Sequence, residues 1–332
     1  MDAKITKERI SRMLSYDWLK IIGLCVAAIF FWTLVFTVSA TRITTAQQFT
    51  VINYFGNAGM VNTSFSKDFT KAFNDGLFSY EVIDISEVDV GGNAEMGATL
   101  MQTRVATEEG DVVFVPDLTD AGSEYEINGE KYQDTYLQNL VRNYGWNLEN
   151  LDRKQAGSFF NRLEAFLNEY YGNYAEENAT LNTEKVKQDF LARVAKNKDK
   201  RFKTDAQKEK GIRDEIKRVE KYRNALIEFD GYLESGLVQL TATQVRNIET
   251  GELSESKVYS INICPNPEKM PNLIKIAGYW VEVLNEAGEK QSDKLSALNM
   301  NVAIMRFEGM EGTFEFESLL YINHVIRTGK TQ

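Results

Sequence analysis

Residues 49–55 read FTVINYF, residues 80–90 read YEVIDISEVDV, and residues 111–116 read DVVFVP. The first and third are short apolar runs typical of buried strands, and the second alternates apolar and polar side chains as a half-buried strand does. Helical spacing of apolar residues fills the two connections, at 66–77 and 91–110. Parallel strands need helical crossovers of about this length. The order βαβαβ therefore predicts an α/β fold.

The rest of the chain changes character twice. Residues 121–235 are predicted to be helical, with an aromatic-rich stripe whose spacing favours packing of one helix against another. Strands return at 237–242, 258–263 and 300–305, an amphipathic piece at 273–280 lies between the last two, and a helix closes the chain at 314–326. The stripe consists of Phe159, Phe160, Leu163, Phe166, Leu167, Tyr170, Tyr171 and Tyr174.

One segment is long and apolar enough to cross a membrane. Ile21 to Ala40 is twenty residues without a charge, about 30 Å of helix. Five basic residues precede it and Arg42 alone follows within 25 residues, so the positive-inside rule places the N-terminus in the cytoplasm. A signal peptide cleaved after Ala40 is the alternative, but the apolar run is longer than such peptides usually have.

The expected organisation has three parts. Residues 1–20 form a cytoplasmic tail, 21–40 a single-pass anchor in the cell membrane, and 41–332 an extracytoplasmic domain. Within that domain we expect a first lobe at 41–120, a helical region at 121–235 and a mixed α/β segment at 236–332. The lipid bilayer is thus the first predicted partner.

Composition excludes several function classes. A net charge of -10 disfavours nucleic acid as a partner. Cys25 and Cys264 offer no disulfide framework, and the single histidine, His324, lacks a triad context and is interpreted as structural. No metal, no cofactor and no catalytic residue is predicted, so the protein is not expected to be an enzyme, although an unrecognised carboxylate pair stays open.

Residues 185–223 form a basic segment in this acidic chain. They contain 15 basic and 7 acidic side chains. Three interpretations stay open: a solvated helical face of mixed charge, a surface that touches acidic lipid headgroups, and a docking site for an acidic partner.

Several stretches carry a family resemblance: FNDGLFSYEV at 73–82, LMQTRVATEEG at 100–110, DVVFVPD at 111–117, and MNVAIMRF with FEFESLLYINHVIRT near the C-terminus. Together they resemble extracellular solute-binding proteins of the periplasmic-binding-protein-like type II fold. The resemblance implies a two-lobed α/β domain. The helix-rich middle departs from the family pattern, and the strands after residue 236 are expected to supply the second sheet. It also implies capture of a small polar solute without catalysis.

In such a fold, ligands bind beyond the carboxyl ends of parallel strands. Polar residues follow the first and third strands here, and two tryptophans offer stacking platforms, although turn formation, helix capping and core packing explain the same residues. The candidate ligand-binding residues are Asn53, Tyr54, Gly56, Asn57, Asp117, Trp146 and Trp280.

Two functional hypotheses follow from the sequence. The first is a membrane-anchored extracytoplasmic protein that captures a sugar, an amino acid or a similar solute for transport or sensing, with a membrane permease as partner. The second is a non-catalytic scaffold or accessory subunit of a membrane complex, which keeps a solute-binding-like fold with a degenerate cleft.

Overall fold

The chain forms two compact units, Met1–Thr44 and Thr45–Gln332. The expected anchor boundary at Ala40 lies outside the residues that the structure describes. The structure is a computed structural model that describes residues 6–39, 47–54, 64–90, 94–284, 290–307 and 316–330.

Within its described residues, 6–39, the first unit contains one helix, α1, which spans Lys7–Ser39. Its stretch Trp18–Thr37 is long and apolar enough to cross a membrane, and none of it is buried inside the protein. The hydroxyls of Thr33 and Thr37 donate to the carbonyl oxygens of Ile29 and Thr33 at 2.7 and 2.6 Å. These polar groups are therefore satisfied within the helix, as a lipid environment requires. One N-terminal segment able to span a membrane is thus confirmed, and its orientation stays a prediction.

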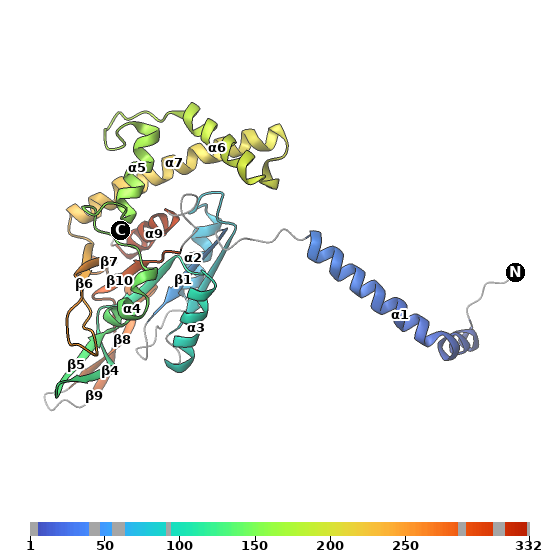
Figure 1. Ribbon diagram of the computed structural model, residues 1–332, viewed down its shortest axis with the longest axis horizontal. Coiled ribbons are helices and arrows are strands. Elements are labelled where there is room, and N and C mark those ends of the chain that lie inside the picture. Colours follow the sequence, from blue (N-terminus) through green and yellow to red (C-terminus); the bar gives the residue numbers. More distant parts are fainter. Residues whose placement is uncertain are drawn as a thin grey trace. The chain divides into compact units, whose positions relative to one another are not determined.

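The second unit is built on one six-stranded sheet with the strand order β2-β1-β3-β10-β7-β6 (Figure 1). β1 pairs in parallel with both β2 and β3, so the predicted βαβαβ unit is confirmed. Its elements are β1 Gln48–Asn53, α2 Ser64–Asn74, β2 Asp84–Asp89, α3 Ala94–Ala106 and β3 Val112–Pro116.

The strands after residue 236 extend this same sheet. β10, Met300–Ile304, lies antiparallel beside β3 with Val302 opposite Phe114, and β7, Lys257–Asn262, and β6, Gln239–Thr243, follow. Every residue of β3 and β10 is buried, and strands covered on both faces belong in the middle of a sheet. The expected separate sheet of a second lobe is therefore not confirmed in the described part of the chain.

A hairpin interrupts the region from 121 onward that was expected to be helical. It joins β4, Thr119–Ile127, to β5, Glu130–Thr135. Asn128 and Gly129 form its turn with φ of 54° and 86°. Asn-Gly is the pair that two-residue hairpin turns prefer, because both positions need positive φ.

A second hairpin replaces most of the amphipathic piece after residue 273. Only α8, Ile274–Ala277, is helical there, and β8, Tyr279–Leu284, then pairs with β9, Lys290–Ser296. Both hairpins are two-stranded sheets separate from the main one.

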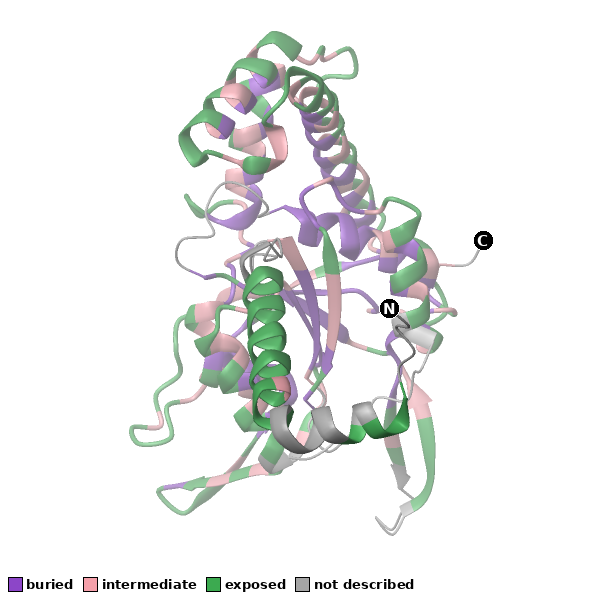
Figure 2. Ribbon diagram, turned by 90° about the vertical axis from the view of Figure 1, so that its right-hand side faces the viewer, coloured by how far each residue is buried: buried purple, intermediate pink, exposed green. Residues whose placement is uncertain are grey.

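Helices cover both faces of the main sheet. α3 and α4 pack on one face, and α2, α5, α7 and α9 pack on the other. Figure 2 shows the burial concentrated in the sheet and in the helices next to it. Most of the predicted aromatic stripe lies in the core, which confirms helix packing as its role. The helices after β5 are α4 Tyr136–Tyr144, η3 Gly145–Asn147, α5 Phe159–Tyr171, α6 Thr183–Asn197, η4 Lys200–Phe202, α7 Asp205–Glu234 and α9 Glu317–Gly329.

Candidate functional site

The residues at the end of β1 are packed into the fold. Asn53 is 1% exposed, and its Nδ2 donates to Oε1 of Glu87 at 3.0 Å. The backbone N–H of Tyr54 donates to the carbonyl of Phe114, and its ring meets Tyr144 edge-on with centroids 6.3 Å apart. Burial raises the pKa of Tyr54 to about 12, so its phenol is neutral. The side chains of Asn53 and Tyr54 therefore contact Glu87 and Tyr144 at this edge of the sheet.

Asp117 lies at the same edge of the sheet. It follows β3, is exposed, and its N–H donates to the carbonyl oxygen of Asn299 at 3.0 Å. Because β1 and β3 are parallel neighbours, the structure brings Asp117 and Tyr54 to one side of the sheet. Gly56 and Asn57, the other candidates after β1, lie outside the described residues.

The two candidate tryptophans are separated. Trp280 lies in β8 and is 40% exposed. The adjacent Tyr279 is close enough to Asp117 to be affected by its charge, because burial and that charge together raise the pKa of Tyr279 to about 12. Trp146 lies in η3 and is 80% exposed. The nearby Leu148 forms a β-bridge with Met305, which follows the last residue of β10. That end of β10 pairs with the first residue of β3, Val112, at the edge of the sheet opposite to Asp117. Trp280 is thus on the Asp117 side of the sheet, and Trp146 is at the opposite edge.

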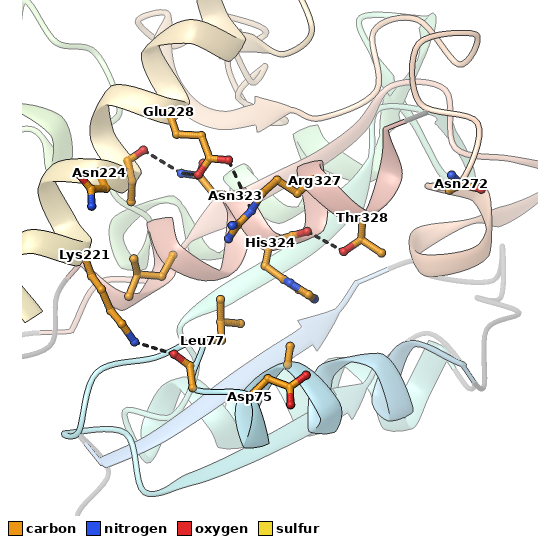
Figure 3. Close-up of a pocket in the computed structure, with 14 residues that line it drawn as sticks. Asp75, Leu77, Lys221, Asn224, Glu228, Asn272, Asn323, His324, Arg327 and Thr328 are labelled. Atoms are coloured by element: carbon orange, nitrogen blue, oxygen red, sulfur yellow. Dashed lines mark hydrogen bonds and ion pairs between the residues drawn. The ribbon is translucent and has the colours of Figure 1, made fainter. Parts of the chain in front are cut away.

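A groove of about 660 Å³ lies elsewhere, between α2, α7 and α9 (Figure 3). This volume is typical of small-molecule sites. Most of the lining side chains are polar, and they carry both signs of charge. They are Ala72, Asp75, Gly76, Leu77, Lys221, Asn224, Ala225, Glu228, Asn272, Leu320, Asn323, His324, Arg327 and Thr328.

Asn323 lies in the groove wall with an unmet hydrogen bond. It is 1% exposed on α9, and its Nδ2 donates to the carbonyl of Ala225 at 2.8 Å and to Oε2 of Glu228 at 3.3 Å. Its Oδ1 is buried and accepts no hydrogen bond from any described residue. Leaving a buried acceptor unpaired costs about 1–3 kcal/mol. The groove wall therefore contains a buried acceptor that the described residues leave unpaired.

The charged end of the groove is formed by Glu228 and Arg327. Nε of Arg327 lies 3.4 Å from Oε1 of Glu228, and Figure 3 shows the two side chains reaching across from α7 and α9. Tyr232 donates its hydroxyl hydrogen to the same carboxylate. Among the described residues Arg327 has no other ion pair, so its terminal nitrogens are available to an anion.

The other end of the groove is formed where α2 stops. Gly76 has φ of 80°, a left-handed conformation that suits glycine after a helix, and this turn places Asp75 at the rim. Nζ of Lys221 donates to the carbonyl oxygens of Gly76 and Phe78 at 2.6 and 2.8 Å. Burial lowers the pKa of Lys221, and the two carbonyls fix its ammonium against the turn. The backbone N–H of Asp75 donates to Lys71, but its carboxylate forms no hydrogen bond or ion pair with the described residues.

His324 also lines the groove. Its Nε2 lies 3.1 Å from Oδ2 of Asp68, and its carbonyl accepts a hydrogen bond from the Thr328 hydroxyl. Within the described ranges, no group of three or more His, Cys, Asp or Glu side chains has an arrangement that holds a metal ion. The groove therefore offers hydrogen bonds and charges of both signs, which suits binding of a polar molecule.

Sequence reasoning missed this groove because its walls come from α2, α7 and α9, which are far apart along the chain. The one local signal is Asn74-Asp75-Gly76, a turn sequence at the end of a predicted helix. Comparison with protein-family models, with curated proteins and with solved structures found no match.

Proposed function

We propose that this protein is a membrane-anchored extracytoplasmic binding protein that captures a small polar solute for transport or sensing. The groove between α2, α7 and α9 is its binding site. The observation that carries the proposal is the buried, unpaired Oδ1 of Asn323 in the wall of a groove of ligand size. No catalysis is part of this role.

A free amino acid fits the groove better than a sugar. Its carboxylate can accept hydrogen bonds from the guanidinium of Arg327, a planar donor matched to that group. Its ammonium can donate to Oδ1 of Asn323 and approach the carboxylate of Glu228. A neutral sugar would leave the charge of Arg327 unused.

The membrane segment supports the same role. α1 is suited to span the bilayer, and five basic residues before Ile21 favour a domain outside the cell. The resemblance of the βαβαβ unit to solute-binding proteins supports delivery of the solute to a membrane permease as partner.

The test is thermal unfolding of the full chain in detergent against amino acids, sugars, peptides and polyamines. A ligand at 100 times its Kd adds about 2.7 kcal/mol, which raises the Tm by several degrees. We expect amino acids to give this shift and Arg327→Gln to abolish it. Arg213→Gln, which removes the same charge from an exposed site on α7, is the matched control and should keep the shift. A shift that survives Arg327→Gln would refute the groove as the site.

One observation favours the scaffold hypothesis. Asn53 and Tyr54 are packed into the sheet edge, while Trp146 is 80% exposed, as a residue that contacts another protein would be. If no solute raises the Tm and Trp146→Ala abolishes co-purification of a membrane protein, the scaffold role replaces solute capture.

A further inference from the structure

A cluster of unpaired cations projects where α6 turns through η4 into α7. Residues 196–214 contain eight basic and four acidic side chains. Six of the basic side chains are exposed and form no ion pair with any residue in the described ranges. We name these six the cationic tip: Lys196, Lys198, Lys200, Lys203, Lys210 and Arg213.

The neighbouring arginines are neutralised inside the fold. Arg201 lies 2.7 Å from Asp199 and 2.8 Å from Glu81, and Arg193 lies 2.9 Å from Glu215 and 3.4 Å from Glu81. Of the four acids in residues 196–214, Asp199 pairs with Arg201 and Asp205 pairs with Lys208, so the six exposed cations outnumber Glu209 and Asp214, the two acids that remain. The structure separates an inner, paired set of charges from an outer, unpaired set.

These inner ion pairs also fix the position of the cationic tip within the domain. The carbonyl of Gln47, which immediately precedes β1, accepts a hydrogen bond from the N–H of Ile83 at 2.8 Å. Glu81, two residues before Ile83, holds Arg201 and Arg193. The cationic tip is thus attached to the end of the domain at which the chain arrives from α1.

The chain between α1 and the domain is short. Seven residues, 40–46, separate Ser39 from Gln47, and a chain of this length reaches at most about 25 Å. Covalent linkage to a membrane-spanning α1 therefore raises the effective concentration of lipid headgroups around the domain.

We propose that the cationic tip docks onto anionic lipid headgroups of the membrane in which α1 is anchored. Each lysine or arginine near such a surface multiplies the docked-to-undocked ratio about fivefold. Lysines are depleted in protein–protein interfaces, which are built around aromatic and arginine anchors. A lysine-rich tip beside the tether therefore favours lipid over a protein partner.

The experiment uses the full chain in vesicles of phosphatidylglycerol and phosphatidylcholine, or of phosphatidylcholine alone. Ala206, exposed in the first turn of α7, is replaced by cysteine and labelled with a donor dye for energy transfer to a headgroup dye. Cys264 is buried, and burial raises its pKa to about 11, so it does not compete for label. Cys25 lies in the apolar stretch of α1. We expect strong transfer in the anionic vesicles only, lost at 1 M salt, where charges are screened beyond about 3 Å.

The discriminating variant carries Lys196→Gln, Lys203→Gln and Lys210→Gln. Removing three charges should lower the docked-to-undocked ratio about 100-fold in anionic vesicles. Equal transfer in the two lipid compositions, or transfer unchanged by the triple variant, would overturn the proposal.

The control variant carries Lys154→Gln, Lys269→Gln and Lys294→Gln. These lysines are also exposed, and the change removes the same total charge away from the cationic tip. It should retain the transfer. If both variants reduced transfer equally, the attraction would come from total charge, and the assignment to the cationic tip would be wrong.

Discussion

Asp111→Asn is expected to stabilise the domain at neutral and alkaline pH. Asp111 immediately precedes β3, and its Oδ2 accepts a hydrogen bond from the backbone N–H of Thr50 at 2.7 Å. Burial raises the pKa of this carboxyl from 3.8 to about 7, against the lowering effect of the Thr50 hydrogen bond, and the charge of Glu317 adds to the rise. The folded protein therefore keeps a proton that the unfolded chain has already lost.

The sign follows from proton binding. Between pH 3.8 and about 7 the folded state binds more protons than the unfolded state, so stability falls as the pH rises through this window. A rise of roughly 3 units in the pKa of Asp111 corresponds to a loss of about 4 kcal/mol in the free energy of unfolding above pH 7. Because Asp111 is partly exposed, solvent screening reduces this loss to about 2–4 kcal/mol. Asparagine stays neutral and can still accept from Thr50. The free energy of unfolding of Asp111→Asn should exceed that of the unchanged protein by about this amount at pH 8 and should be almost the same at pH 4.

The assay is guanidinium unfolding of the full chain in detergent, followed by near-ultraviolet circular dichroism at pH 4, 6 and 8. The quantity compared is the free energy of unfolding of Asp111→Asn minus that of the unchanged protein. Asp117→Asn, an exposed carboxyl at the other end of β3, is the matched control. A difference that is the same at all three pH values would refute a protonated Asp111 in the folded state.

Three further changes test the packing. Gly211→Ala should destabilise the protein by about 1–3 kcal/mol in thermal unfolding, because a Cβ at this position would overlap aromatic rings of α6 and η4. The control is Gly231→Ala in the same helix, where a Cβ meets no other atom, and it should be neutral or stabilising. Arg218→Met should lower the free energy of urea unfolding by about 3–5 kcal/mol, because it leaves the buried Glu215 without its closest cation. Gly129→Ala, at φ of 86°, should speed proteolysis of the β4–β5 hairpin.

The parallel half of the sheet was predictable because its signals are local. β1 and β3 are apolar runs of five or six residues bounded by turn residues, and the helices between them have clear spacing. The β4–β5 hairpin was also marked locally, by Asn128-Gly129, but the helical pattern that follows it led to a helical prediction from residue 121.

The partner strand of β3 was not predictable from local pattern. β10 is recognisable as a buried strand, yet nothing within Met300–Ile304 says whether it starts a new sheet or joins an existing one. Whether β10 joins the sheet depends on its antiparallel pairing with β3, in which Val302 lies opposite Phe114. These two residues are nearly 190 positions apart in the sequence. The groove depends on the same kind of long-range contact, since Asn323 meets Ala225 and Glu228 only after α9 packs on α7.

The groove and the cationic tip lie on one helix, yet the two proposals can fail separately. Lys210 and Glu228 are 18 residues apart on α7, about 27 Å along its axis. The buried Glu215 and Arg218 lie between them, and Glu215 ties the middle of α7 to Arg193 of α6 and to Tyr80. Changes at such distances, with no shared partner, add independently. If only Arg327→Gln abolishes the rise of Tm caused by amino acids, the result supports the groove as the solute site. If only the triple lysine variant abolishes docking onto lipid, the result supports the cationic tip as the docking surface. A variant that lost both would indicate that α7 itself had been displaced.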